Sequence, residues 1–304
     1  MNRSAPTAAG WAALALVFNS LVWGLSWWPF RQLEAQGLHP LWSTVLVYLP
    51  AVVVIVALRP QAVRQLLTQR SLWVLVLAAG ATNAAFNWAT VIGDVVRVVL
   101  LFYLMPLWSV LLARWLLKEP LTWTALARIL LALAGAGIVL QPDSPTGGSA
   151  LPLPQSLADW LGVLGGFTFA LNNVMLKRES HQPEAGRALA MFVGGVVVSG
   201  ALAAVLGAVG QVPWPMAADA ASAPGWLWWL ALSMSGLFLS SNLALQFGAS
   251  RLPVHITSVL MLSEVLVAAV SAAVMGAGHI TGPLLLGGGL IVLAAVWAAH
   301  ERPD

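Results

Sequence analysis

Glu264 is the side chain whose type and position carry the most chemistry in this sequence. It lies near the middle of an apolar stretch, residues 254–276, among apolar or small neighbours. A charged residue at the centre of a membrane helix costs about 2.5–3.5 kcal/mol on insertion scales. We therefore expect Glu264 to be protonated, paired or in contact with water. In a functional role, Glu264 could bind a substrate amine or carry a coupling proton. In a structural role, it could be a protonated packing residue, and the sequence supports both roles equally.

Carboxamide side chains form a second group inside apolar stretches. Asn83 and Asn87 are four residues apart and therefore share one face of a helix. Amides both donate and accept hydrogen bonds, so they could hold a zwitterion without titrating. The alternative is that they join helices, at about 0.6 kcal/mol per hydrogen bond. Because such residues recur in both halves of the chain, we expect a polar cavity lined by Asn83, Asn87, Asn172, Asn242 and Gln246.

Asp94 and Arg97 are three residues apart at the start of an apolar stretch. This spacing predicts an exposed ion pair, with a periplasmic gate as the more specific interpretation. The five histidines all fall near the ends of apolar stretches, which argues against a buried metal site. No zinc-protease, nucleotide-binding or serine-hydrolase motif is present. We therefore expect no catalytic residues, no metal and no cofactor.

The composition places the chain in a membrane. Of 304 residues, 60% are apolar and 8% charged, against about 45–50% and 25% in soluble domains. There is no cysteine, which excludes disulfides. No basic run is long enough for nucleic acid, so the expected partners are lipid and a small-molecule substrate, with a monomer as a plausible state. The expected spans lie near 11–30, 41–58, 71–92, 95–117, 122–140, 158–177, 187–209, 225–247, 254–276 and 281–299.

Two stretches show that the chain is a repeat. Val99–Leu140 and Ile256–Trp297 each contain an apolar run, a short hairpin ending in Thr, and a second apolar run rich in small residues. We therefore predict an all-α membrane protein of ten transmembrane helices, built as two five-helix repeats. The first repeat covers residues 1–140, a linker follows at 141–157, and the second repeat covers 158–304.

The positions of Lys and Arg predict the orientation. With the N-terminus inside, only Arg31 and Arg97 of the 14 basic residues fall outside, as the positive-inside rule requires. Both termini would then be cytoplasmic and the linker periplasmic. The first apolar run continues to Phe30, which favours an uncleaved span over a signal peptide. Because five is odd, the two repeats would be inverted, with a substrate site between them near the midplane.

Two segments resemble a known family. The segment LVWGLSWWPFR at Leu21–Arg31 resembles the first-span motif of EamA-type exporters in the drug/metabolite transporter superfamily. The segment YLMPLWSVLLARWLLKEPLT at Tyr103–Thr122 resembles the proline and hairpin of their fourth span. Within this branch, Trp23, Gly37–Pro40 and Gly166–Ala170 are similar to the YddG-type aromatic amino acid exporters.

The resemblance implies a basket of ten helices around a central cavity, with export to the periplasm. It carries cavity positions over to Tyr103, Met105 and Phe169, although Met105 and Phe169 stand where those exporters usually have Trp. Glu264 stands where the second repeat normally has its proline.

We therefore expect a bacterial inner-membrane exporter of aromatic or bulky hydrophobic amino acids that works by alternating access. Gly24 and Pro106 would let helices bend. A facilitator is favoured over proton antiport, because Glu264 is the only deep acid. One alternative is a multidrug exporter of flat lipophilic cations, and a remote one is a membrane-embedded enzyme or sensor. The residues expected to contact the substrate ring are Trp27, Trp88, Phe102, Tyr103, Met105 and Phe169.

Overall fold

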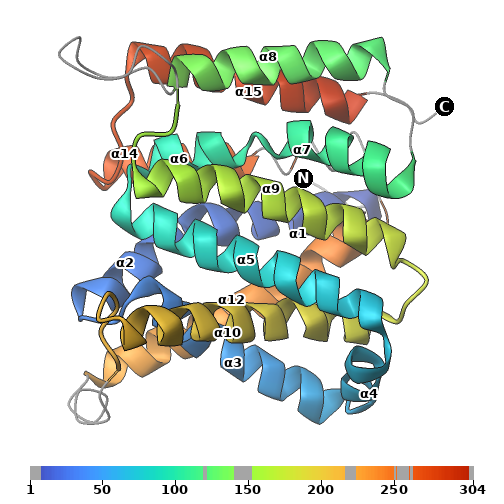
Figure 1. The fold of residues 1–304 in the computed structure, drawn as a ribbon, viewed down its shortest axis with the longest axis vertical. Helices are drawn as coiled ribbons and strands as arrows, with labels where there is room; N and C mark the ends of the chain where they lie inside the picture. The colour runs from blue at the N-terminus through green and yellow to red at the C-terminus, as the bar shows by residue number, and fades with distance from the viewer. Residues whose placement is uncertain are drawn as a thin grey trace, which may run out of the picture.

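The computed structural model describes residues 8–118, 122–139, 153–215, 224–249, 251, 260 and 263–300. All regular structure in this part of the chain is helical (Figure 1). The helices are α1 (Ala8–Leu25), α2 (Trp27–Ala35), α3 (Pro40–Leu58), α4 (Gln61–Thr68), α5 (Arg70–Ile92), α6 (Val95–Phe102), α7 (Met105–Leu112), η1 (Ala113–Leu117), α8 (Trp123–Val139), α9 (Leu157–Arg178), α10 (Glu184–Ala208), α12 (Gly225–Ala249), α14 (Ser263–Val274) and α15 (Gly282–His300). Every predicted apolar stretch contains at least one of them.

The first predicted span is two helices rather than one. The chain breaks at Ser26, whose hydroxyl donates to the Trp23 carbonyl at 2.7 Å. Gly24, which we expected to allow bending, lies two residues before the break. A Cβ at Gly24 would lie 2.8 Å from the Val267 Cβ and 2.9 Å from the Glu264 carbonyl oxygen. The described role of Gly24 is thus the close packing of α1 on α14, and its role in bending stays a prediction.

The fourth predicted span is also interrupted, between α6 and α7. Pro106 is at the first turn of α7, where a proline is tolerated because that N–H would have no helical partner. Its missing N–H leaves the Phe102 carbonyl without the bond of a continuous helix. The backbone of α9 comes close at this point, because a Cβ on Gly166 would lie 2.5 Å from the Phe102 oxygen. The break therefore lies against α9 in the interior.

The sequence did not predict α4. This short helix turns the chain between α3 and α5 and buries Ala62 and Leu66. Because its eight residues include an Arg and two Gln, α4 is not part of any apolar stretch. At the other end of the chain, α14 covers only part of the predicted 254–276 span, since most of 252–262 lies outside the described residues.

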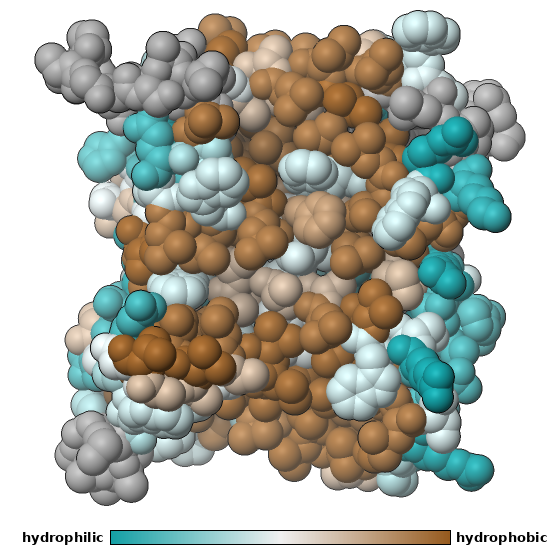
Figure 2. Space-filling model, viewed as in Figure 1, coloured by the Kyte–Doolittle hydropathy of each residue, from teal (hydrophilic) through white to brown (hydrophobic). Residues whose placement is uncertain are grey.

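The long helices run side by side across the view of Figure 1, with α8 and α15 forming a layer at one end. In Figure 2 an apolar band separates more hydrophilic left and right edges, where the helices end. Within the described residues, six helical segments are long and apolar enough to cross a membrane, counting α1–α2 and α6–η1 as single segments. These features are those of a multi-pass membrane protein.

Glycines allow the closest contacts between the predicted halves. In the pairing of α8 with α15, a Cβ on Gly287 would lie 2.6 Å from the Gly135 oxygen, and a Cβ on Gly135 would lie 2.5 Å from the Gly287 oxygen. The pairing of α5 with α10 is similar, since Gly80 and Gly194 each pack against the backbone of the other helix. Small residues at helix crossings are how membrane helices approach closely.

This packing predicts that Gly287→Val will destabilise the protein while Gly289→Val will not. Both positions are in α15, so the loss of glycine flexibility is matched, but a Cβ at Gly289 meets nothing within 4 Å. Overpacking at Gly287 should cost about 1–3 kcal/mol. Thermal unfolding in detergent measures the difference, and equal melting temperatures for the two variants would contradict the crossing.

Candidate functional site

An aromatic cluster lies where the broken helices meet α9 and α14. Phe102 is at its centre, with ring centroids 5.3 Å from Phe169, 4.9 Å from Phe86 and 6.3 Å from Tyr103. Trp27 is buried in the same cluster, and Met105 and Phe169 pack against it while keeping partial exposure. We call these residues the aromatic cluster: Trp27, Phe86, Phe102, Tyr103, Met105 and Phe169. The structure thus brings together five of the six predicted ring contacts and adds Phe86.

Trp88 does not belong to this cluster. It packs beside α3 and α10, against Leu41 and Ala203. Its indole meets the His39 ring edge-on at 5.1 Å. Burial lowers the pKa of His39, which favours the neutral ring. Trp88 thus packs between the cluster of Leu41, Ala84 and Ala203 and a second one that includes Val98 of α6 and Leu161 of α9. Phe86, two residues earlier on α5, instead faces Phe102.

Glu264 lies beside the aromatic cluster, as expected. It is in the first described turn of α14, and Val265 and Ala268 of that helix pack within the cluster. The residue as a whole is half-buried, but its carboxyl group lies deep in the protein, near Tyr103. Among the described residues no hydrogen bond reaches this carboxylate, which leaves its oxygens available to a ligand.

The amides of α5 are used within the protein. The Asn83 Oδ1 accepts a hydrogen bond from the Tyr48 hydroxyl at 2.7 Å, and its Nδ2 donates to the Ala79 carbonyl at 2.8 Å. The Asn87 Nδ2 donates to the Thr44 hydroxyl at 3.1 Å. These bonds join α5 to α3 in a fully buried setting, which favours the role of joining helices for both residues.

The remaining amides differ from one another. Asn172 on α9 is buried, and its Oδ1 has no hydrogen-bond donor. Its Nδ2 is 3.5 Å from the Asn173 Oδ1, at the limit of a hydrogen bond. Asn242 on α12 is half-buried. The prediction for the Gln246 side chain falls outside what the structure describes.

Hydrogen bonds between the two predicted halves were not foreseen from the sequence. The Trp27 indole N–H donates to the Ser271 hydroxyl at 3.0 Å, which ties α2 to α14. Asn19 on α1 donates to the Ser241 hydroxyl and carbonyl on α12, at 2.6 and 3.0 Å. Thr82 on α5 donates to Thr168 on α9 at 3.0 Å. The feature of the sequence that could have indicated these hydrogen bonds is a single polar residue within an apolar stretch, such as Asn19.

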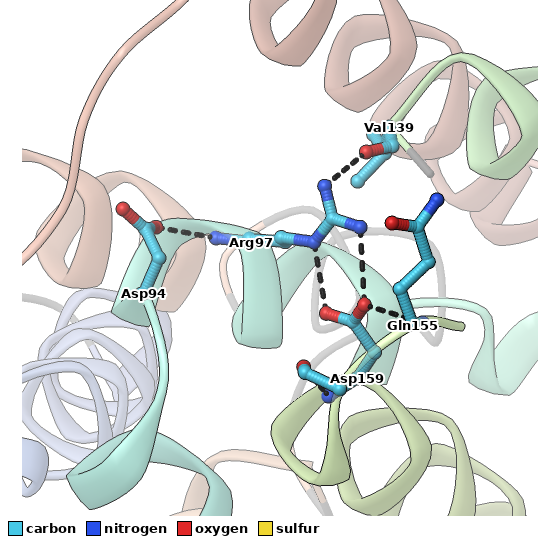
Figure 3. Close-up of polar contacts among 6 residues, drawn as sticks. Asp94, Arg97, Val139, Gln155 and Asp159 are labelled. Atoms are coloured by element: carbon cyan, nitrogen blue, oxygen red, sulfur yellow. Dashed lines mark hydrogen bonds and ion pairs between the residues drawn. The ribbon is translucent and has the colours of Figure 1, made fainter. Parts of the chain in front are cut away.

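The predicted Asp94–Arg97 ion pair is wrong. Figure 3 shows the Arg97 guanidinium turned away from Asp94 and bound to Asp159 of α9 by two bonds, at 2.8 and 3.0 Å. Its third nitrogen donates to the Val139 carbonyl at 2.7 Å. Asp94 instead caps α6, because its carboxylate accepts the Arg97 backbone N–H at 3.0 Å. The short Asp side chain bonds to its own helix turn, whereas the long Arg side chain extends to a neighbouring helix.

Further contacts close the same end of the bundle. Asp94 also accepts the His279 backbone N–H at 2.7 Å, from the connection between α14 and α15. The guanidinium of Arg31 donates to the Thr90 and Gly93 carbonyls, at 3.0 and 2.6 Å, and lies 5.4 Å from the Trp27 ring centroid. Contacts from α2, α5, α6, α9 and the α14–α15 connection therefore meet at this end.

Residues 10–141 match the family model of EamA-like transporters. The match supports a domain of this family, within the drug/metabolite transporter superfamily, over the first predicted repeat. EamA-like proteins are transporters, so the match indicates a membrane transporter acting on a small molecule. It also agrees with the expectation that the chain is not an enzyme.

The fold recurs in solved structures. One of them, described only as the crystal structure of a protein, has a TM-score of 0.57 with 20% sequence identity. The superposition covers 94% of this chain and 96% of that one. At this identity the likeness shows the fold alone. No curated protein matches the chain.

The ion pair between α6 and α9 predicts a large loss of stability when one partner is removed. Arg97→Gln and Asp159→Asn should each cost about 3 kcal/mol, because Asp159 is buried and either change leaves a charge without its partner. Thermal unfolding of the two single variants and the double variant gives the coupling energy. The Asp94→Asn variant keeps an oxygen for the helix cap and should therefore lose less stability. Strictly additive single effects would contradict the pair.

Proposed function

We propose that the protein exports aromatic or bulky hydrophobic amino acids and related metabolites across a bacterial inner membrane. The observation that carries the proposal is the aromatic cluster beside the half-buried Glu264. It provides ring surfaces for a flat apolar side chain and an acceptor for an ammonium group. The partial exposure of Met105 and Phe169 within this cluster supports access by a ligand.

The proposed architecture is two inverted five-helix repeats around a central cavity. A two-fold axis between inverted repeats would exchange the first span with the sixth and the third with the eighth, so α1–α12 contacts should mirror α5–α9 contacts. Both pairs are in contact. The axis would also make the α1–α14 contact the mirror of the α6–α9 contact. It would place α3 next to its counterpart α10, and α8 next to its counterpart α15. All of these pairs are in contact. This pattern supports the repeat boundaries at residues 1–140 and 158–304.

The proposed orientation has both termini in the cytoplasm and the linker 141–157 in the periplasm. Of the two arginines assigned to the outer side, Arg31 donates to backbone carbonyls and Arg97 binds Asp159 and the Val139 carbonyl. Most of the linker lies outside the described residues. Bound guanidinium groups at this end suit the positive-inside rule, because Arg97 is neutralised by Asp159 and Arg31 is bound to two backbone carbonyls.

Alternating access would open one end of the bundle at a time. The contacts of Arg97 with Asp159 and of Trp27 with Ser271 join the two halves near the proposed outer end. Release of substrate to the periplasm would require some of these contacts to separate. The breaks at Ser26 and before Pro106 lie next to the aromatic cluster, where bending would change its shape. In this proposal Gly24 and Pro106 act as the flexible points.

A second candidate is export of flat lipophilic cations. The observation in its favour is Glu264 itself, a carboxylate beside aromatic rings. Aromatic faces attract organic cations, and the carboxylate would act as counter-ion. An amino acid would in addition need a partner for its carboxylate, for which amide donors such as Asn172 are the available groups.

Flux in liposomes tests the proposed function. With purified protein, labelled Phe and Trp should move across the bilayer faster than in protein-free vesicles, and a lipophilic cation should not. Phe169→Ala should lower aromatic flux about 2- to 10-fold, the range expected for the loss of an aromatic contact. Trp88→Ala is the matched control, since Trp88 is partly buried outside the aromatic cluster. Absence of aromatic amino acid flux would overturn the proposal, and cation flux alone would favour the second candidate.

The Glu264→Gln variant tests how transport is driven. For a facilitator, aromatic flux should follow the substrate gradient and be the same with and without a pH gradient, in both the parent protein and the variant. The two proteins are compared in vesicles with imposed gradients. A pH-driven component that disappears in Glu264→Gln would contradict the facilitator and support proton antiport.

A further inference from the structure

The outer surface of α4 combines cationic and apolar side chains. Ala62 and Leu66 are buried against the bundle, one turn apart. On the opposite surface Arg64 is exposed, and Leu67 is 65% exposed. Leu58, at the end of α3 just before α4, is 71% exposed. A short helix with this division of faces is typical of the boundary between acyl chains and headgroups.

Several helix ends gather around α4. It contacts α3, α5 and α10. A Cβ at Gly186, in the first turn of α10, would lie 2.6 Å from the Gln65 Oε1, so the two elements touch. On the other side, the Ser71 hydroxyl donates to the Glu179 carboxylate at 2.8 Å and joins the start of α5 to the end of α9. This places the basic residues of four helix ends at one edge of the bundle.

These residues form what we call the basic edge: Arg59, Arg64, Arg70, Lys177, Arg178 and Arg187. In Figure 2, hydrophilic side chains line the right-hand edge, where Figure 1 shows α4 and the turn between α9 and α10. The acids on these elements are few. Glu179 is buried and shared by Ser71, Arg178 and His181, and Glu184 is exposed. The positive charge is therefore only partly neutralised.

Four of the arginines have no partner among the residues that the structure describes. Within the described part of the chain, no hydrogen bond or ion pair involves the side chain of Arg59, Arg64, Arg70 or Arg187. Arg187 is half-buried, and its Nε is buried without an acceptor. The neighbouring Gln65 Oε1 is buried without a donor. Leaving such groups unsatisfied is unfavourable, so a ligand that both accepts and donates would be stabilised here.

We propose that the basic edge binds the headgroup of an anionic phospholipid of the phosphatidylglycerol type. The phosphate would accept from Arg64 and Arg187, and a headgroup hydroxyl would donate to Gln65. Its acyl chains would lie along Leu58 and Leu67, which is why a lipid is favoured over free phosphate. The proposal rests on the membrane placement assumed in the proposed function, and not on any substrate.

Native mass spectrometry of the full-length protein in a neutral detergent tests this proposal. The parent protein should retain phosphatidylglycerol in preference to phosphatidylcholine. The double variant Arg64→Gln with Arg187→Gln should lose this preference, by roughly fivefold for each arginine removed. The variant Arg64→Lys with Arg187→Lys, which keeps the charge, should keep most of it. Thermal unfolding without lipid shows whether each variant is folded.

Arg251→Gln is the matched control. Arg251 is exposed, follows the end of α12 and contacts Phe247 of that helix, whereas the helices packed on α4 are α3, α5 and α10. The Arg251→Gln variant should leave the preference for phosphatidylglycerol unchanged. An equal loss in Arg251→Gln would show diffuse attraction and overturn the site, as would full retention in the double glutamine variant. Displacement of the lipid by millimolar inorganic phosphate would identify a free-anion site instead. Because no substrate is present, failure of amino acid flux would leave this result standing.

Discussion

The absence of water in the bilayer core is the constraint on which the rest of this structure depends. Every backbone N–H and C=O there must be satisfied within the protein, so the spanning segments must be helices. Helices can then approach closely only through small residues, as at the α8–α15 crossing of Gly135 and Gly287. The same constraint makes a break in a helix rare and restricts it to places where protein surrounds it.

The two interior breaks described here lie near each other. Ser26 separates α1 from α2, and the segment before Pro106 separates α6 from α7. Trp27 directly follows the first break, and Tyr103 lies within the second. Both side chains belong to the aromatic cluster. The parts of the backbone that depart from a helix are thus the parts that position the candidate binding residues, which is a common arrangement in transporters.

Polar groups in this interior fall into two physical classes. Asn83, Asn87 and Arg97 have their hydrogen bonds met by other helices, and they hold the bundle together. Other polar groups lack a partner within the described residues: no hydrogen bond reaches the Glu264 carboxylate, and buried atoms such as the Asn172 Oδ1 and the Trp108 Nε1 have none either. An unsatisfied buried polar group is unfavourable, so such groups persist where a ligand or water can reach them. Glu264 and Asn172 are site candidates because they combine this property with a place beside the aromatic cluster or in the predicted polar cavity.

The sequence by itself determined the helices, because the length of an apolar stretch and the charges at its ends are local properties. Predicted stretches such as 41–58 and 71–92 agree with α3 and α5 within a residue. The residues flanking Pro106 supplied three of the six members of the aromatic cluster, Phe102, Tyr103 and Met105. Only the tertiary structure decided that Trp88 turns away from that cluster and that Asn83 and Asn87 bind α3. It also decided that Arg97 pairs with Asp159, 62 residues further along the chain. These outcomes depend on how each helix is rotated and which distant helix it meets, and no local pattern carries that information.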